Sequence, residues 1–368
     1  MHQALRSGDP EAMILCCSGP EMPGRGPFVL LYTNNDTGHT GHMSWKEMGE
    51  IYTSLAAHLF KHRRWGVLQP SCLVVGLPGV LEEARMRATL HFMCGGQVDI
   101  GDELTTLPED RWEVLYATLP PQGRAAKPVD LFEPVPVVTM SQEAMRRRNN
   151  ASQAPLPIRQ ASSVWSLDME ADWDRWTLVS LVDYEGPAGA DGGVTIFRLA
   201  LERVGLDPNG TYWAHEFWSG QFLGEVPSLH PLIKTPACPE GYVHPGDHKC
   251  LIDTQFPGVL DIAFVGPGVK LLVLRAKRDH PWVAATSFYQ GGGTELQAVR
   301  WDPAKRELSG KVTRPPGHLG KIYICGAPGL PTLVEVAGRR VTARAGANQS
   351  VIVPVVTEAE VTPVRLRW

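Results

Sequence analysis

Two apolar runs decide the fold of this chain: MILCC at residues 13–17 and FVLLY at residues 28–32. Both runs are short, continuously apolar and bounded by glycine or proline, a pattern that predicts strands buried on both faces. An amphipathic helix is expected from Ser44 to about Arg63, because Ser44 can cap it and Glu47 follows three residues later. The start of the chain therefore reads as strand, strand and helix.

The same alternation continues to about residue 130. Further strands are predicted at 72–75 and 97–100, and helices at 80–93 and from Pro108 onward. Alternation of this kind is typical of an α/β sheet with parallel strands. Strands that are apolar on both faces fit either a closed barrel or a doubly wound sheet. The sequence alone leaves these two possibilities open.

The pattern then changes to β structure. Prolines and the basic triplet at 146–148 mark residues 131–163 as a linker, and short strands separated by glycine, proline and aspartate follow it. Such spacing predicts β-sandwich regions. We expect a first region at 1–130, the linker at 131–163, a β-sandwich region at 164–228 and a further β domain at 229–368.

Composition excludes several classes of protein. The chain has 368 residues, with 35 Lys and Arg against 39 Asp and Glu, for a formal charge of -4. A nucleic-acid partner is not expected, because it would need a basic face. No apolar run approaches the ~20 residues that span a bilayer, and the N-terminus has no signal layout. Seven cysteines do not make a disulfide framework. A soluble protein with reduced thiols is expected, and a cytoplasmic location is favoured over others.

Polar residues follow the first two predicted strands. Cys16, Cys17, Ser18 and Gly19 end the first, and the second is followed by a loop that contains Asn35 and Asp36. In a parallel barrel the carboxyl ends of the strands converge on the active site. A carboxylate flanked there by a thiol, amides and hydroxyls suits acid–base chemistry on a polar ligand. Asp36 could equally cap the following helix or stabilise a turn.

These residues resemble motifs of the melibiase-type α-galactosidases of glycoside hydrolase family 36. The family carries C-x-S-G-G-G-R on one strand end and W-x-S-D-D-T-D on the next. Here CCSG at 16–19 and TNNDT at 33–37 stand in those places, and IGDEL at 100–104 resembles a later S-D-D-L stretch. The resemblance is best over residues 15–134. It implies a fold of the α/β plus all-β class: the C-terminal part of a (β/α)8 barrel, followed by one or two antiparallel β-sandwich regions.

The resemblance also implies roles for individual residues. The family's general acid/base carries over onto Asp36, and sugar contacts carry over onto Cys16, Ser18, Gly19, Asn35 and Asp102. Asp99 lies at the same strand end. The chain departs from the family pattern in two places. The G-G-R segment is missing, with Arg25 as a loose substitute for its arginine, and Tyr32 stands in place of the family's tryptophan. These departures put the sugar specificity in question.

The family's nucleophile is harder to place. It lies in a K-W-D strand upstream of the C-x-S-G strand, and no K-x-D precedes Cys16 here. A complete (β/α)8 barrel needs ~250 residues, whereas about 125 precede the linker. The chain is therefore expected to be the C-terminal part of an enzyme, without the nucleophile strand. Half a barrel would leave unpaired strand edges and an apolar interior, so it should aggregate or stay partly open without the other half.

Two functions remain open. One is retaining hydrolysis of α-galactosides or related α-glycosides, and the other is a non-catalytic carbohydrate-binding or pseudo-enzyme role. The expected partner is an oligosaccharide or α-galactoside, with no nucleic acid or membrane, and a homo-oligomer is possible. No cofactor and no metal are expected. His39 and His42, and the Cys/His-rich loop at 238–250, have spacings unlike those of zinc sites.

Overall fold

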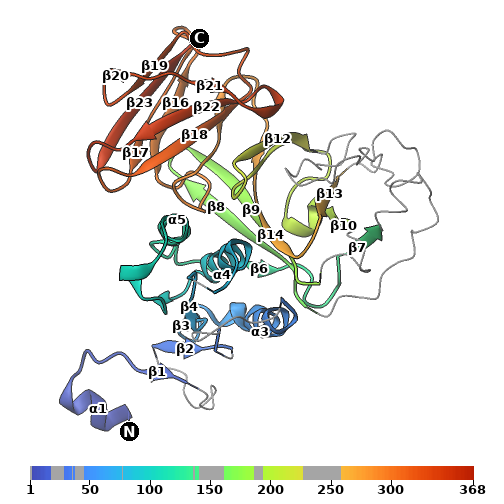
Figure 1. Cartoon of the computed structure of the whole chain (residues 1–368), viewed down its shortest axis with the longest axis vertical. Coiled ribbons are helices and arrows are strands. Elements are labelled where there is room, and N and C mark those ends of the chain that lie inside the picture. Colours follow the sequence, from blue (N-terminus) through green and yellow to red (C-terminus); the bar gives the residue numbers. More distant parts are fainter. Residues whose placement is uncertain are drawn as a thin grey trace. The chain divides into compact units, whose positions relative to one another are not determined.

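The computed structural model describes residues 2–17, 29–34, 36–37, 45–76, 78–135, 137–140, 161–185, 194–226 and 258–368. The chain divides into two compact units (Figure 1). The first comprises Met1–Pro134 and Arg159–Leu167, and the second comprises Val135–Ile158 and Asp168–Trp368. Both contain strands, and the long helices lie in the first unit.

Short parallel strands form the centre of the first unit. β1 (Leu15–Cys16), β2 (Leu30–Tyr32) and β3 (Val67–Gln69) make one sheet in that order, and β4 (Cys72–Leu73) pairs with β5 (Asp99–Ile100). Every one of these pairings is parallel, as the strand–helix alternation predicts. Because the strands are parallel, their carboxyl ends lie at the same edge of each sheet.

Helices connect these strands. α1 (His2–Gly8) precedes β1, and α3 (Trp45–His58) with η1 (Leu59–Lys61) joins β2 to β3. α4 (Leu81–Cys94) joins β4 to β5, and η2 (Leu104–Thr106) and α5 (Glu109–Thr118) lead to β6 (Lys127–Pro128). The helix expected as far as Arg63 is shorter: α3 ends at His58, η1 ends at Lys61, and Arg63 takes a positive φ of 59° in the turn before β3. That three-residue strand was not predicted.

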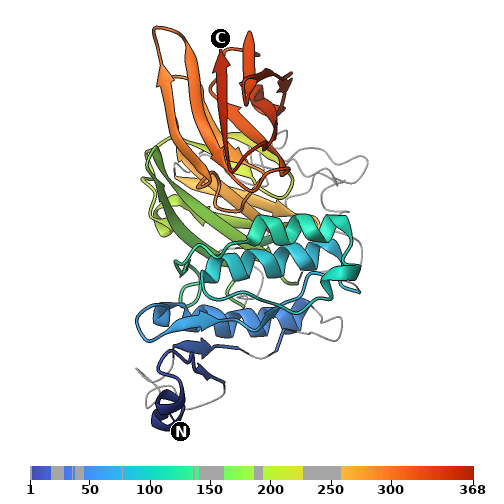
Figure 2. The same ribbon diagram turned by 90° about the vertical axis from the view of Figure 1, so that its left-hand side faces the viewer.

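The ends of α4 follow from its sequence. The carboxylate of Glu83 accepts a hydrogen bond from the backbone N–H of Val80, the residue before the helix. Gly95 ends the helix with φ 68°, a conformation that costs glycine little. Almost the whole of α4 is buried, and it lies beside α5 (both teal in Figure 2).

The two faces of the β1–β2–β3 sheet differ in exposure. Cys16, Leu31 and Leu68 form one row across the strands and are 5%, 2% and 0% exposed. The adjacent row is Leu15, Leu30 and Val67, of which Leu15 is 40% exposed and the other two are half-buried. One face is therefore covered and the other is partly open.

The second unit is built from antiparallel sheets. One contains β12 (Gln221–Val226), β11 (Tyr212–Glu216), β14 (Gly268–Ala276), β9 (Asp174–Asp183) and β8 (Val164–Ala171), in that order. β8 begins in the first unit, where it pairs with β6. A second sheet has the order β13 (Val259–Phe264), β10 (Val194–Ala200) and β7 (Val137–Met140), and η4 (Leu201–Val204) follows β10. β7 lies in the segment for which the sequence predicts a linker.

Two more sheets occupy the C-terminal part of this unit. The first has the order β15 (Trp282–Thr286), β18 (Leu319–Cys325), β22 (Val351–Val356) and β21 (Arg344–Ala345). The second has the order β16 (Leu296–Asp302), β17 (Glu307–Thr313), β23 (Val361–Arg367), β19 (Leu333–Val336) and β20 (Arg339–Arg340), and η6 (Ala347–Gln349) precedes β22. The sequence predicts strands of this unit at 176–182, 194–197, 212–218, 260–265, 269–274, 321–325, 332–336, 350–356 and 361–366. The strands of this unit that were not predicted are β7, β8, β12, β15, β16, β17, β20 and β21.

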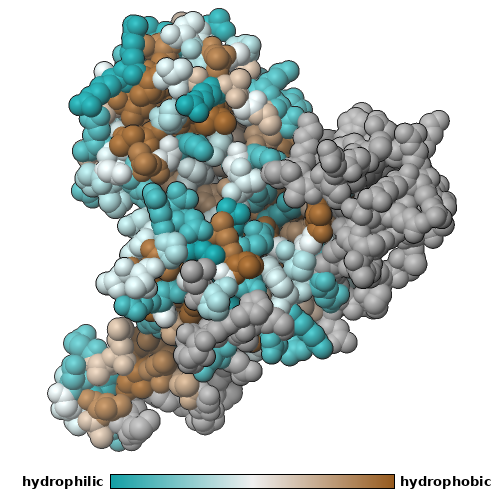
Figure 3. Space-filling view, viewed as in Figure 1, coloured by the Kyte–Doolittle hydropathy of each residue, from teal (hydrophilic) through white to brown (hydrophobic). Residues whose placement is uncertain are grey.

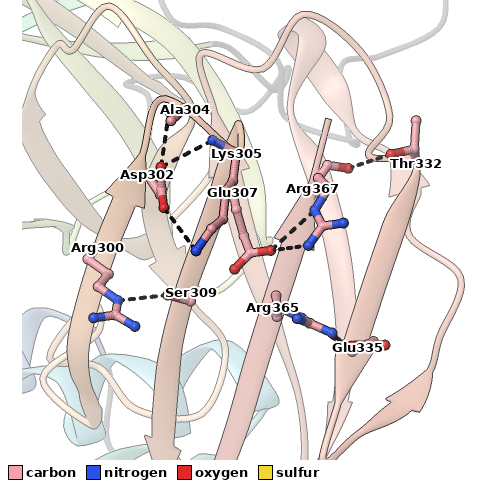
Figure 4. A network of polar contacts seen from close by, with 10 residues as sticks. All are labelled: Arg300, Asp302, Ala304, Lys305, Glu307, Ser309, Thr332, Glu335, Arg365 and Arg367. Carbon is pink, nitrogen blue, oxygen red and sulfur yellow. Dashed lines mark hydrogen bonds and ion pairs between the residues drawn. The ribbon is translucent and has the colours of Figure 1, made fainter.

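Burial alternates along the last strands. In β22 and β23 every second residue is buried, which is the pattern of strands with one face toward a core. The other face of β16, β17, β23 and β19 carries charged pairs (Figure 4). The Arg367 guanidinium lies 2.8 Å from the Glu307 carboxylate, and Arg365 pairs with Glu335. This outer face is therefore a polar ladder of cross-strand pairs.

A buried cation lies at the centre of the second unit. Arg275 of β14 is 1% exposed, and its guanidinium carbon lies 4.5 Å from the Trp173 ring centre and 3.9 Å from that of Trp176. Asp174 accepts from Arg275 Nη1 at 2.8 Å. The carbonyl oxygen of Gly292 accepts from Nη2 at 2.6 Å. The glycine triplet at 291–293 forms a turn, and its backbone helps to hold this arginine.

Candidate active site

Asp36 lies on the loop that follows β2. Tyr32, the last residue of β2, donates a hydrogen bond from its hydroxyl to Oδ1 of Asp36. Partial burial and this bond to Asp36 raise the pKa of Tyr32 to about 12, so its hydroxyl stays protonated at neutral pH. Asp36 itself is exposed to solvent. The carboxylate is thus accessible and has a donor fixed at the end of a strand.

The next segment of chain fastens this loop. The backbone N–H of Thr37 donates to Oγ of Ser71 at 3.2 Å, and the Thr37 hydroxyl donates to the carbonyl oxygen of Cys72. On the other side of Asp36, Nδ2 of Asn34 donates to the carbonyl oxygen of Pro70 at 3.3 Å. These bonds tie the residues flanking Asp36 to the connection between β3 and β4. The position of Asp36 is therefore set by two neighbouring strand ends.

A second carboxylate lies on this side of the strands. Asp99, in β5, accepts from Nε2 of Gln69 and from Nε2 of Gln97, each at 2.6 Å, so each of its oxygens has an amide donor. Burial raises the pKa of the Cys72 thiol, and the charges of Asp99 and Asp36 raise it further. Cys72 also pairs with Asp99 across β4 and β5, and its carbonyl oxygen accepts from Thr37, the neighbour of Asp36. We call Tyr32, Asp36, Cys72 and Asp99 the strand-end cluster.

The other predicted site residues fall in different places. Cys16 is buried in β1, while Ser18, Gly19 and Asn35 lie outside the described residues. The Asp102 carboxylate accepts from the backbone N–H groups of Val75 and Gly76 at 2.7 and 2.8 Å. It fastens the chain after β4, and its role in sugar binding stays a prediction. Arg25, His39, His42 and the loop at 238–250 also lie outside the described residues.

Sequence reasoning missed the residues that hold the cluster in place. Gln69 belongs to an unpredicted strand, and Ser71 follows it with a positive φ of 68°. Asp99 was noted at its strand end, but its two amide partners were not. A signal for one of them was present, because Gln97 stands two residues before Asp99 on the same predicted strand and alternation puts both on one face.

The cluster can bind a polyhydroxylated ligand and move a proton. Carboxylates accept hydrogen bonds from sugar hydroxyls, the Tyr32 oxygen can also accept one while its proton stays bonded to Asp36, and an accessible carboxyl can serve as a general acid or base. Within the described ranges no group of three or more His, Cys, Asp or Glu residues is placed to hold a metal ion. None of the helices in the described part of the chain is long and apolar enough to cross a membrane.

Known proteins were compared with the whole chain. No protein-family model matches it, and no curated protein matches it either. Among solved structures, the chain is similar to α-galactosidase I from Mortierella vinacea, with 12% identity and a TM-score of 0.46 over 74% of this chain and 61% of that one. It is also similar to a GH27 β-L-arabinopyranosidase from Geobacillus stearothermophilus, with 11% identity and a TM-score of 0.45 over 74% and 53%.

A third similar structure is the α-galactosidase of Saccharomyces cerevisiae, with 11% identity and a TM-score of 0.36 over 68% of this chain and 60% of that one. The chain thus spans between about half and three fifths of the length of these proteins. The family named among them is GH27, whereas the sequence motifs resemble family 36. All three TM-scores are below 0.5, so the functional proposal rests on the residues of this chain.

Proposed function

We propose that the chain is part of a retaining glycoside hydrolase that acts on α-galactosides or related α-linked sugars, with Asp36 as general acid/base. One observation carries the proposal. An accessible carboxylate with a fixed hydroxyl donor, Tyr32, lies at the carboxyl end of a parallel strand. The residue that the family resemblance identifies as acid/base is this same Asp36.

The chemistry proceeds in two steps. In the first, a carboxylate nucleophile attacks the anomeric carbon while Asp36 gives its proton to the departing glycosidic oxygen. In the second, Asp36 removes a proton from water, whose oxygen displaces the nucleophile and releases the sugar. Tyr32 orients the Asp36 carboxyl through its hydrogen bond in both steps. Cys16, Ser18, Gly19, Asn35 and Asp102 are proposed to contact the sugar.

The second carboxylate must lie ~5–5.5 Å from the first. We assign it to a strand that precedes β1 in a (β/α)8 barrel, of which residues 1–130 form the C-terminal half. The partly open face of the β1–β2–β3 sheet supports this assignment, because its row of Leu15, Leu30 and Val67 would line the interior of such a barrel. Leu15 and Met13 are 40% and 72% exposed, and Figure 3 shows apolar surface over the N-terminal segment.

The antiparallel sheets beyond residue 164 are proposed as the β-sandwich regions that follow the barrel. Family 36 is favoured over GH27 as the finer assignment by the motifs at residues 16–19 and 33–37. The alternative is a non-catalytic carbohydrate-binding or pseudo-enzyme role, which would hold if no second carboxylate is supplied.

The test uses the protein encoded by the complete open reading frame that contains these residues. Wild type should hydrolyse an α-galactoside with retention of anomeric configuration, as followed by NMR of the first product. Asp36→Asn should slow hydrolysis of a substrate with a poor leaving group by about 10²–10⁴-fold, the usual contribution of a general acid. Asp110→Asn, on α5 and 52% exposed, is the matched control. Unchanged turnover in Asp36→Asn would overturn the assignment.

A further inference from the structure

Three aromatic rings gather at one end of the C-terminal sheets in the second unit. His280 lies between β14 and β15, Trp301 is in β16, and Trp368 follows β23. The His280 and Trp301 rings are stacked, with centroids 5.6 Å apart and planes at 15°. The Trp301 and Trp368 centroids are 5.9 Å apart. All three residues are half-buried, and the His280 side chain is 23% exposed. We call them the aromatic platform.

The platform is held in place by the protein. Nε1 of Trp368 donates to the carbonyl oxygen of Gly329 at 2.8 Å, and its backbone N–H donates to the carbonyl oxygen of Arg306 at 3.1 Å. The edge of His280 packs against Trp282 with centroids 5.5 Å apart, and Trp282 is buried. Because these rings are already held in place, the side chains would lose little conformational entropy when a ligand stacks on them.

Polar groups lie beside the rings. Oδ1 of Asp279 is 2.7 Å from Nδ1 of His280, and the Asp279 side chain is 98% exposed. The bond to His280 lowers the pKa of the Asp279 carboxyl, which keeps it an acceptor at neutral pH. Among the described residues, no hydrogen bond is made by the indole N–H of Trp301. The platform therefore offers ring faces, a carboxylate acceptor and an indole donor together.

This combination matches the two chemistries of a pyranose ring. The C–H face of a sugar is apolar and can stack on an aromatic face, while its hydroxyls at the edge need donors and acceptors. A phosphate-bearing ligand fits poorly, because the exposed Asp279 carboxylate would repel it. The surrounding outer face of β16, β17 and β23 consists of charged pairs, so the platform is chemically distinct from it (Figure 4).

We propose that the aromatic platform is a second, non-catalytic binding site for a galactosyl or related pyranose unit of an oligosaccharide. The choice of sugar rests on the proposed function. The solvent-facing side of the stacked Trp301–His280 pair contacts the C–H face of the sugar, and Asp279 accepts hydrogen bonds from its hydroxyls. Such a site would hold a longer substrate and raise its effective concentration at a catalytic site elsewhere in the protein.

The test follows the indole ¹H–¹⁵N signals of the full chain during a titration with raffinose. The Trp301 and Trp368 signals, assigned from single Trp→Phe variants, should shift in a saturable manner at millimolar sugar. Trp301→Ala should weaken binding by about tenfold or more, as loss of an aromatic anchor does. Asp279→Ala changes an exposed side chain, so it leaves folding intact, and it should weaken binding several-fold.

Matched controls decide the outcome. Trp112→Ala removes another half-buried tryptophan that stacks on an aromatic neighbour, Tyr116, and it should bind as wild type does. The proposal would be overturned if the indole signals do not shift, or if Asp279→Ala binds the sugar as wild type does. Displacement of the sugar by choline would also overturn it, because it would show that the platform binds cations. Asp36→Asn separates the two proposals. If that variant, made from the complete open reading frame, hydrolyses normally but the indole signals still shift, the platform stands and the proposed acid/base falls.

Discussion

Replacing Arg275 should cost the second unit far more stability than replacing an exposed arginine with a similar pairing distance. Arg275→Ala removes a guanidinium that is 1% exposed, leaves the Gly292 carbonyl oxygen without its donor, and leaves a cavity beside the stacked rings of Trp173 and Trp176. Burial lowers the pKa of Arg275 to about 10, against the raising effect of Asp174, so the residue is charged at neutral pH.

The magnitude follows from burial. Breaking a buried ion pair by removing one partner costs ~3–5 kcal/mol, because the other charge stays buried. Asp174 keeps bonds from Arg278 and from Nε1 of Trp282, which places the expected loss near 3 kcal/mol, at the low end of that range. Arg175, 2.7 Å from Glu170 and 80% exposed, is the control, and Arg175→Ala should cost about 1 kcal/mol or less.

The assay is urea unfolding followed by tryptophan fluorescence, since the rings that flank Arg275 report on this unit. A shift of the midpoint at constant slope measures the change in the free energy of unfolding. If Arg275→Ala loses no more stability than Arg175→Ala, burial is not what makes this pair important, and the reasoning is refuted.

Two further predictions concern pH and the strand-end cluster. Burial lowers the pKa of His91 to about 4 and that of His215 to about 3, so both are neutral when folded. Below pH ~6.5 the two histidines take up protons in the unfolded chain but stay neutral in the folded protein. The free energy of unfolding is therefore highest above that pH, and each histidine should lower it by about 2 kcal/mol between pH 6.5 and 5. A His215→Phe variant with the same pH dependence of unfolding would contradict this. In the cluster, Tyr32→Phe removes the donor to Asp36. Loss of a hydrogen bond to a charged group should slow turnover by about tenfold and leave the Michaelis constant little changed, whereas the control Tyr116→Phe should have no effect. Equal turnover rates in the two variants would exclude Tyr32 from orienting the carboxyl.

The sequence predicts the first unit well where local signals are strong. α4 and α5 begin within one residue of their predicted starts, because Pro78 and Pro108 mark helix entry and acidic residues fill each first turn. β3 was missed because it is three residues long and follows a basic turn. β16 was missed because a bulge between Gln297 and Arg300, with Ala298 at φ 51°, breaks its alternation.

The candidate sites divide in the same way. The place of Asp36 at a strand end follows from a local motif, so the sequence predicts it. The bonds from Gln69 and Gln97 to Asp99 depend partly on strand pairing, and pairing is not a local property. The aromatic platform joins His280, Trp301 and Trp368, which are far apart along the chain. Only the folding of the antiparallel sheets brings them together, so no local pattern could predict it.

The central claim is that Asp36 is the acid/base of an α-galactoside-cleaving enzyme. Its most direct test compares wild type and Asp36→Asn, both made from the complete open reading frame, on two α-galactosides that differ in leaving group. If Asp36 protonates the glycosidic oxygen, the variant should release a poor leaving group about 10²–10⁴-fold more slowly, while the first turnover of a substrate with a good leaving group stays close to wild type. Equal rates for both substrates in the two proteins, or no α-galactoside cleavage by wild type, would contradict the account.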